Sequence, residues 1–492
     1  MAHRRTKINA KIATPNGNRT IPVGNKTLVD AVFEDLGLNV FLDGLKRNQG
    51  ESVAAETRAL VSNSAEMTGI SIERLDRFLS DSIVREEYGL GGSASKSIYR
   101  TVERIGMNSD AIVGYIAESM KRGYGVGMDT VFMDWTSMYF EAPQNGIVRI
   151  GYSRDRRPDR PQVTVGLSLD RDSGLPIGLT VMPGNVLDVT HFRETFMQVR
   201  HLLPKDAMVV FDNGAYSKEN AALLDEEGIG FVTRLQLNSS DDAFVRDHTD
   251  EWNYLKDDIL WMYREGNRKR VRYVMFNMKL KQDILDRYRK KAERDYDDMV
   301  NMKNALKNNK KPRKKYRNSN CFVNTHLSYQ FPLDTLTREE AIEEAVRRMT
   351  SGREGLFVLV SNRPLTAEEI LRYYRERNAV EDAFRDLKHG IDWRPARCTS
   401  EYAIKGRILI SFLALFCMSM LRCLYPQFRT KTAESISEEL GSFSLTVFFR
   451  RNGEKRKVWS NYGPMIMALY GRETPVPMPK SSKQAVLEAY SA

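Results

Sequence analysis

The spacing of apolar residues changes along the chain and separates predicted helices from predicted strands. Up to about residue 125, apolar positions recur at helical spacing, as in 28–45 and 71–79. Residues 89–96 are rich in glycine and serine and predict a flexible joint, after which 97–107 resumes the helical pattern. Basic helical units at a chain start often bind DNA, whereas an oligomerisation or purely structural role is the alternative.

From about residue 128 the pattern becomes that of strands. Residues 130–140, 146–152 and 162–169 predict three successive strands of an antiparallel meander. The elements expected next are a helix at 190–203, a strand at 207–212, a helix at 217–227 and a strand at 230–235. This order is typical of an RNase H-like domain, an α/β fold whose mixed sheet is flanked by helices.

Residues 238–350 interrupt that pattern and predict a large insertion domain. Within them, 279–306 predicts a long charged helix or a helical hairpin. The run 307–317 is strongly basic, which suits either a solvated loop or a clamp over a phosphate backbone.

The second part of the core is expected after the insertion. Residues 355–361 predict another buried strand, and Thr366 is the expected N-cap of the next helix. Near the C-terminus, Asn452-Gly453 between two strand-like runs predicts a hairpin. The predicted division is a helical N-terminal region with probable DNA-binding function (1–125), the RNase H-like core (126–237), the insertion domain (238–350), the rest of the core (351–430) and a small C-terminal region (431–492).

The predicted helix over 373–388 carries a distinctive set of polar residues. At about 100° per residue, Arg377, Glu381 and Lys388 lie at about 300°, 340° and 320° relative to Tyr374. A phenol, two cations and a carboxylate would then share an arc of about 60°, which suits a surface that grips phosphates and holds a metal. The alternative is an amphipathic helix with surface salt bridges.

Two aspartates upstream strengthen the first interpretation. Asp134 interrupts an otherwise apolar strand, where a carboxylate is unfavourable unless a cation or donors compensate it. Asp212 ends a buried strand at the edge where α/β sheets place ligands. A buried ion pair for Asp134 and ordinary turn chemistry for Asp212 are the alternatives.

Together with Glu381, these aspartates form a candidate metal site. The first and fourth strands of an RNase H-like sheet are neighbours, so Asp134 and Asp212 could bind a shared ion. Carboxylate oxygens without His or Cys favour Mg²⁺ or Mn²⁺. Two such ions would support an in-line displacement at a phosphodiester.

Composition points to a nucleic-acid partner and away from a membrane. The 492 residues carry a net charge of +11, which favours a polyanion, although membrane contact or no specific role are alternatives. The four cysteines lack a CxxC spacing, and the polar start of the sequence shows no secretory signal, so a reducing, cytoplasmic location is expected. The apolar run 408–421 is short for a membrane span and predicts a buried helix.

These motifs resemble those of a known family. Tyr374, Arg377, Glu381 and Lys388 match a Tyr-x2-Arg-x3-Glu-x6-Lys signature without a gap. That signature marks a branch of the DDE transposases of bacterial and archaeal insertion sequences, which belong to the RNase H-like superfamily. The segments 151–159 and 183–188 also resemble family motifs, and the similarity covers roughly 125–425.

The resemblance implies roles for individual residues. It implies that Asp134, Asp212 and Glu381 bind two ions, and that Tyr374, Arg377 and Lys388 hold phosphates of the transposon-end strand. The residues with an open alternative are Trp252 and Trp261 (base stacking or core packing) and Arg154, Arg156 and Arg157 (DNA contact or hairpin connection).

The resemblance also implies an activity. The expected function is a DNA transposase that binds terminal inverted repeats, cleaves strands with the help of metal ions and transfers a 3′-hydroxyl into target DNA. Its expected partners are double-stranded DNA and a second copy of the chain in a synaptic complex, at the nucleoid of a prokaryote. A structure-specific nuclease or resolvase, and a non-catalytic DNA-binding regulator derived from a transposase, are the competing interpretations.

Overall fold

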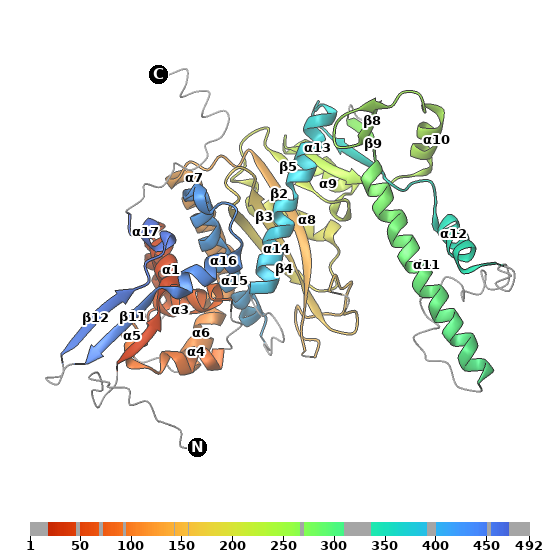
Figure 1. Cartoon of the computed structure of the whole chain (residues 1–492). Coiled ribbons are helices and arrows are strands. Elements are labelled where there is room, and N and C mark those ends of the chain that lie inside the picture. Colours follow the sequence, from red (N-terminus) through yellow and green to blue (C-terminus); the bar gives the residue numbers. More distant parts are fainter. Residues whose placement is uncertain are drawn as a thin grey trace. The chain divides into compact units, whose positions relative to one another are not determined.

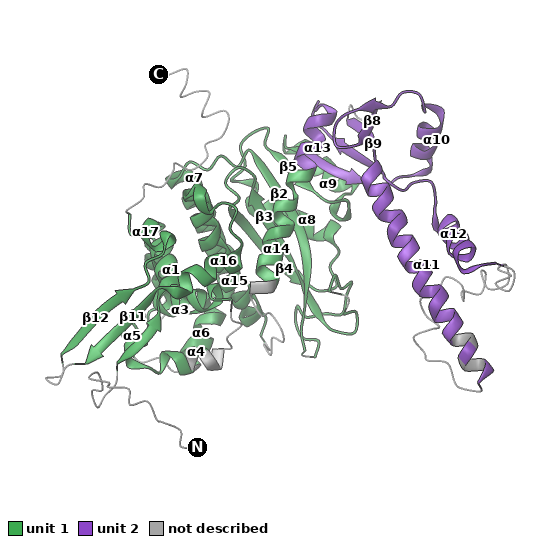
Figure 2. Ribbon diagram, in the orientation of Figure 1, with its two compact units in different colours: residues 1–230, 375–492 green, residues 231–374 purple. Residues whose placement is uncertain are grey.

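The computed structural model describes residues 18–45, 50–67, 72–91, 95–141, 143–155, 157–265, 270–308, 336–390, 400–449 and 454–471. The chain divides into two compact units, coloured separately in Figure 2. Residues 1–230 and 375–492 form the first unit, and residues 231–374 form the second. The five-part division expected from the sequence stays a prediction.

The first unit contains the core sheet, in the strand order β4-β3-β2-β5 (Figure 1). Strands β2 (Thr130–Tyr139), β3 (Gln162–Asp170) and β4 (Pro176–Pro183) are antiparallel, whereas β5 (Met208–Phe211) runs parallel to β2. Helix α8 (Asp188–Arg200) connects β4 to β5 and packs on β3 and β4. The parallel step through a helix beside an antiparallel meander is the RNase H-like arrangement, so the predicted fold class is confirmed.

The predicted second strand of the meander, 146–152, was wrong, and strand β4 was not predicted. Residues 146–152 form only isolated bridges, Asn145 to Val148 and Arg149 to Gln162, and the third strand is β4. Its sequence begins and ends with proline and contains Gly178, which hides the strand pattern. The glycine has a packing reason, because a Cβ there would lie 2.7 Å from the Val199 side chain of α8.

A buried helix, α15 (Glu401–Leu424), organises the rest of the first unit. It is long and apolar enough to span a membrane, but 83% of its most apolar window is buried inside the protein, as the sequence predicted. Helix α6 (Ser95–Met107) crosses it closely through two glycines. A Cβ on Gly106 would lie 1.8 Å from the Tyr402 carbonyl oxygen, and one on Gly406 would lie 1.9 Å from the Val102 carbonyl oxygen.

The two ends of the first unit share secondary structure. Strand β1 (Arg19–Pro22) pairs with β11 (Ser444–Phe449), which pairs with β12 (Lys455–Ser460) in the antiparallel way that the sequence predicted. The predicted turn residues, Asn452-Gly453, lie outside the described residues. The remaining elements are α1 (Gly24–Asp35), α2 (Leu38–Gly44), α3 (Val53–Ala65), α4 (Ile72–Leu79), α5 (Ser82–Tyr88), α7 (Ser109–Gly123), α9 (Lys218–Glu226), α16 (Ala433–Ser442) and α17 (Pro464–Leu469).

The second unit combines an antiparallel sheet with long helices. Its strands follow the order β6 (Gly230–Leu235), β10 (Leu356–Ser361), β9 (Val271–Asn277), β8 (Ile259–Glu265) and β7 (Asn253–Tyr254). Helix α11 (Met278–Lys307) is a single helix, and α12 (Arg338–Met349) packs on it through Ala292, Met299 and Ile342. Helix α10 (Ser239–Asp247) lies between β6 and β7 in the sequence of this unit. Most of the basic run 307–317 lies outside the described residues.

The close crossing of α6 and α15 gives a stability prediction. We expect Gly406→Ala to lower the free energy of unfolding by about 2–3 kcal/mol, because its methyl group would overlap a backbone carbonyl that cannot move alone. Gly114→Ala in α7 is the matched control, since nothing lies within 4 Å of its Cβ. It should raise stability by about 0.5–1 kcal/mol. Urea unfolding of both variants measures this, and equal midpoints would contradict the prediction.

Candidate active site

The parallel pairing of β2 and β5 brings two predicted acids to the same level of the sheet. The register pairs Thr130 with Met208 and Phe132 with Val210. Asp134 and Asp212 each lie two residues beyond the last of these pairs. Asp212 leaves the strand in extended backbone and precedes a short 3₁₀ turn, η1 (Asn213–Ala215). The sheet therefore places the two carboxylates on adjacent strands, near the end of their pairing.

The predicted signature helix is wrong in one respect, because it is two helices. Helix α13 (Ala367–Glu376) ends before Arg377, and α14 (Asn378–Gly390) begins after it. The single arc calculated from Tyr374 therefore does not hold. The physical reason lies in Arg377, whose side chain is only 7% exposed and whose Nη1 lies 3.6 Å from Asp134 Oδ2. That tertiary ion pair competes with the local helical geometry.

Arg377 connects Asp134 to the third predicted acid. Its Nη2 donates to Oε1 of Glu381 at 2.6 Å, across one turn of chain. Glu381 is 52% exposed, and α14 packs on β2 and β3. The guanidinium thus lies between an acid of the sheet and an acid of the helix.

Burial of Asp134 is electrostatically unfavourable. The pKa of its carboxyl is raised to about 6, because burial disfavours the charged form. Arg377 is the largest opposing influence, and Asp212 raises this pKa further. Asp134 therefore needs positive charge nearby when it is ionised.

A second arginine and a fourth acid complete the cluster. Arg154 donates to the backbone carbonyl of Trp135 and forms an ion pair with Asp188, at the start of α8. Burial raises the pKa of Asp188, Arg154 opposes that shift, and Asp212 adds to it. The sequence interpretation assigned no role to Asp188. The available signal was an aspartate at a helix N-terminus beside a family-like segment.

The remaining predicted phosphate contacts lie around this cluster. Lys388 Nζ lies 2.8 Å from Oδ1 of Asp155, which joins α14 to the loop before β3. In that loop, Arg157 pairs with Asp159 at 3.0 Å and lies over the Tyr139 ring. Arg156 lies outside the described residues. Contact of any of these side chains with DNA stays a prediction.

Three predicted aromatic residues belong to the second unit. Tyr374 is half-buried in the last turn of α13. Trp252 packs against Phe276 with 6.1 Å between ring centroids, and Trp261 packs edge-on against Tyr273 at 5.4 Å. Both tryptophans are half-buried. Base stacking by either stays a prediction.

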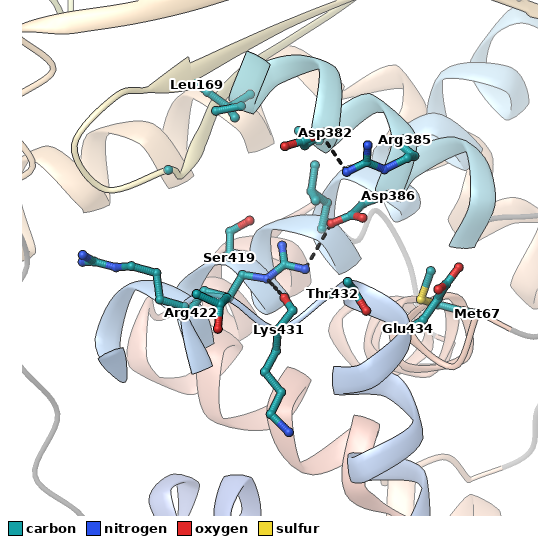
Figure 3. A pocket seen from close by; sticks show the side chains of 16 residues that line it. Met67, Leu169, Asp382, Arg385, Asp386, Ser419, Arg422, Lys431, Thr432 and Glu434 are labelled. Carbon is teal, nitrogen blue, oxygen red and sulfur yellow. Dashed lines mark hydrogen bonds and ion pairs between the residues drawn. The ribbon is translucent and has the colours of Figure 1, made fainter. Parts of the chain in front are cut away.

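The other acids near the signature are engaged elsewhere. Asp382 and Asp386 line a cavity between α14, α15 and the segment before α16, where they pair with Arg385 at 2.6 Å and Arg422 at 3.1 Å (Figure 3). Glu376 pairs with Arg171 at 2.6 Å. These contacts stabilise the packing of α14 and set Glu381 apart as the acid on the Asp134 side.

The donor set fits divalent ions such as Mg²⁺ or Mn²⁺. Asp134, Asp212 and Glu381 supply only carboxylate oxygens, the ligands that these hard cations prefer. Within the part of the chain that the structure describes, no three His, Cys, Asp or Glu side chains are close enough together to hold an ion as they stand. Without an ion, Arg377 supplies the positive charge that Asp134 and Glu381 need. Glu381 is 52% exposed, so its side chain can reorient toward an ion. The residues therefore fit the ions in chemistry and charge.

Carboxylates on β2, after β5 and on α14 of an RNase H-like sheet are typical of a class of enzymes that act on phosphodiesters. Residues 126–417 match the Transposase DDE domain family, so more than half of the chain is covered. The chain belongs to this family. Membership of the branch with the Tyr-x2-Arg-x3-Glu-x6-Lys signature stays a prediction.

Other comparisons are more distant. The chain is similar to the piggyBac transposase in the cryo-EM structure of its synaptic complex with hairpin DNA, at 12% identity and a TM-score of 0.40, covering 89% of this chain and 81% of that one. None of the curated proteins compared with the chain matches it.

The raised pKa of Asp134 gives a pH-dependent prediction. In the unfolded chain Asp134 ionises near 3.8, whereas the folded protein retains its proton until about pH 6. The unfolded state therefore loses the proton first, and the stability contributed by Asp134 falls as pH rises through this interval. Without divalent ions, Asp134→Asn should leave stability unchanged at pH 4 and raise it by about 1–2 kcal/mol at pH 7.5.

Unfolding by urea at the two pH values measures the effect. Asp247→Asn is the control, because that carboxylate is 62% exposed at the surface. A destabilised Asp134→Asn protein at pH 7.5 would mean that the pair with Arg377 outweighs the burial of the charge.

Proposed function

We propose that the chain is a DNA transposase that cuts the phosphodiester at transposon ends and joins the freed 3′-hydroxyl to target DNA. The main support is the register of β2 and β5, which aligns Asp134 with Asp212, together with the Arg377 link from Asp134 to Glu381. Family membership supports the same activity. Terminal inverted repeats, a dimeric synaptic complex and a prokaryotic nucleoid location belong to this proposal.

In this mechanism the three acids hold two divalent ions. Asp134, Asp212 and Glu381 would bind them, and the bound ions would activate a water or a 3′-hydroxyl and stabilise the leaving oxygen. Asp134 must lose its proton to act as a ligand, and Arg377 favours that loss. The burial of Asp134 and Arg377 limits competing water at the reacting centre.

The cations around the acids would hold the DNA strand. Arg377 must release at least one carboxylate to reach a phosphate, and its planar fork suits bidentate contact. Lys388 would release Asp155 in the same way to contact a phosphate. Tyr374 would add a phenol hydroxyl, and Arg156 and Arg157 would extend the contact along the backbone. A net charge of +11 supports salt-dependent DNA binding of this kind.

The helix that carries Glu381 offers a matched test of catalysis. Glu381→Gln should lower metal-dependent cleavage of end-sequence DNA by about 100-fold or more while DNA binding persists, because a ligand is lost and the fold is kept. Asp134→Asn and Asp212→Asn should behave alike. Asp382→Asn is the control, since its exposed carboxylate pairs with Arg385 and lines the cavity shown in Figure 3.

The assay should use paired end sequences, a labelled target duplex and either Mg²⁺ or Mn²⁺. Strand-transfer products identify a transposase, whereas cleavage alone would identify a nuclease or resolvase. Binding without either product would favour a regulator. Full cleavage by Glu381→Gln would refute the assignment of the acids.

Metal binding can be measured without DNA. We expect Mn²⁺ at 100 times its Kd to stabilise the full chain by about 2.7 kcal/mol, as for any ligand of the native state alone. This stabilisation should weaken below about pH 6, where Asp134 holds its proton. Thermal unfolding with and without Mn²⁺ checks this. The same stabilisation in a protein carrying Asp134→Asn and Asp212→Asn would show that the ion binds elsewhere.

A further inference from the structure

Arg154 and Asp188 form a connection inside the acidic cluster that the proposed chemistry does not use. The backbone N–H of Arg154 donates to Ser137 Oγ at 2.9 Å, and its guanidinium donates to the carbonyl of Trp135. Both contacts are on β2, on the C-terminal side of Asp134. These two hydrogen bonds therefore hold the loop before β3 against β2, next to Asp134.

The other end of the connection reaches the turn after Asp212. The guanidinium of Arg154 pairs with the carboxylate of Asp188. A Cβ on Gly214 would lie 2.9 Å from Oδ2 of Asp188, so the glycine allows that carboxylate to sit against η1. Asn220 holds the same region, because its side-chain amide donates to the carbonyls of Val189 and Ala215, both at 2.8 Å.

We propose that Arg154 and Asp188 are positioning residues that fix the spacing between the carboxylates of Asp134 and Asp212. This inference rests on the proposed function, since it concerns the geometry of its metal ligands. The Arg154 side chain is 31% exposed, and its guanidinium holds both the backbone beside one ligand and the acid that packs against the turn after the other. Its proposed role is to position these ligands rather than to contact DNA phosphates.

Charge and shape explain why an arginine is needed. The positive charge of Arg154 favours the ionised forms of Asp134 and Asp188, whereas the negative charge of Asp212 disfavours both. Like charges repel strongly in a poorly hydrated site, so loss of Arg154 would leave this repulsion less compensated. The planar guanidinium presents separate N–H groups to the Trp135 carbonyl and to Asp188 at the same time. The single ammonium of lysine has no such fork and holds one partner at a time in this geometry.

Arg157 provides a comparison within the same loop. Its contacts are an ion pair with Asp159, whose side chain is 60% exposed, and a cation–π contact with the Tyr139 ring. Its expected role is a phosphate contact. Loss of such a contact weakens DNA binding and reduces its salt dependence, whereas loss of a positioning residue slows the reaction of bound DNA.

The experiment measures DNA affinity at several salt concentrations and single-turnover cleavage at saturating DNA, using the full chain with Mn²⁺. Arg154→Ala and Arg154→Lys should both slow cleavage by about 10- to 100-fold with DNA affinity changed less than about twofold. Asp188→Ala should slow cleavage similarly, and Arg154→Ala with Asp188→Ala should be no slower than the slower single variant. Arg157→Ala should instead weaken DNA affinity.

Two outcomes overturn the inference. Weaker DNA binding by Arg154→Ala with an unchanged rate at saturation, restored by Arg154→Lys, would make Arg154 a phosphate contact. Additive losses in the double variant would mean that Arg154 and Asp188 act separately.

A separate variant keeps the test decisive if Arg154→Ala fails to fold. Gly214→Ala changes neither Arg154 nor Asp188, but its added methyl group displaces the carboxylate of Asp188. It should therefore also slow cleavage at saturating DNA. A full rate in Gly214→Ala would then overturn the inference. A wild-type chain that cleaves no DNA would refute the proposed function instead, so the two failures are distinguishable.

Discussion

Compensation of buried negative charge by two arginines is the interaction on which the site depends. Burial disfavours the charged forms of Asp134 and Asp188, and the negative charge of Asp212 adds to this cost at both. Arg377 links Asp134 to Glu381, and Arg154 pairs with Asp188. Arg377 thus connects β2 to α14, and Arg154 connects β2 to α8. The same contacts that make the acids tolerable also hold the elements in place.

The sheet supplies the fixed part of this arrangement, and α14 supplies the adjustable part. Every residue of β3 is buried, and β2 is held between β3 and β5, so Asp134 cannot shift without moving the core. Glu381 is half exposed on a helix that begins only at Asn378. Under the proposed function, such a site would have two rigid ligands and one adaptable ligand, and it could tighten around ions and a scissile phosphate. The geometry without metal would then be a starting state for catalysis rather than its final form.

Local patterns predicted the elements and the three acids, because burial and strand ends leave a signal in consecutive residues. Asp134 stood out as a carboxylate among apolar residues, and Asp212 as the end of a buried strand. The break at Arg377 left no such signal, since the helical spacing continues through it and an ion pair with β2 competes with it. Strand β4 was missed because two prolines and a glycine hide its strand pattern. Pro176 and Pro183 are tolerated because β4 lies at the edge of the sheet, and Gly178 leaves room for α8. Asp188 was missed because its partners, Arg154 and Gly214, are remote in sequence.

The same reasoning explains why an arginine, and not a hydrophobic residue, is placed at the break between α13 and α14. A buried ion pair contributes little net stability compared with apolar packing, so stability alone does not favour Arg377 at this position. In the proposed mechanism, its advantage would be that a divalent ion can replace it. An ion that neutralised Asp134 would weaken the attraction that holds the guanidinium, and the guanidinium would then be available to a phosphate. Charge compensation before metal binding and phosphate binding after it would be two states of one side chain, and the proposed mechanism would in this way couple loading of the ions to engagement of the DNA strand.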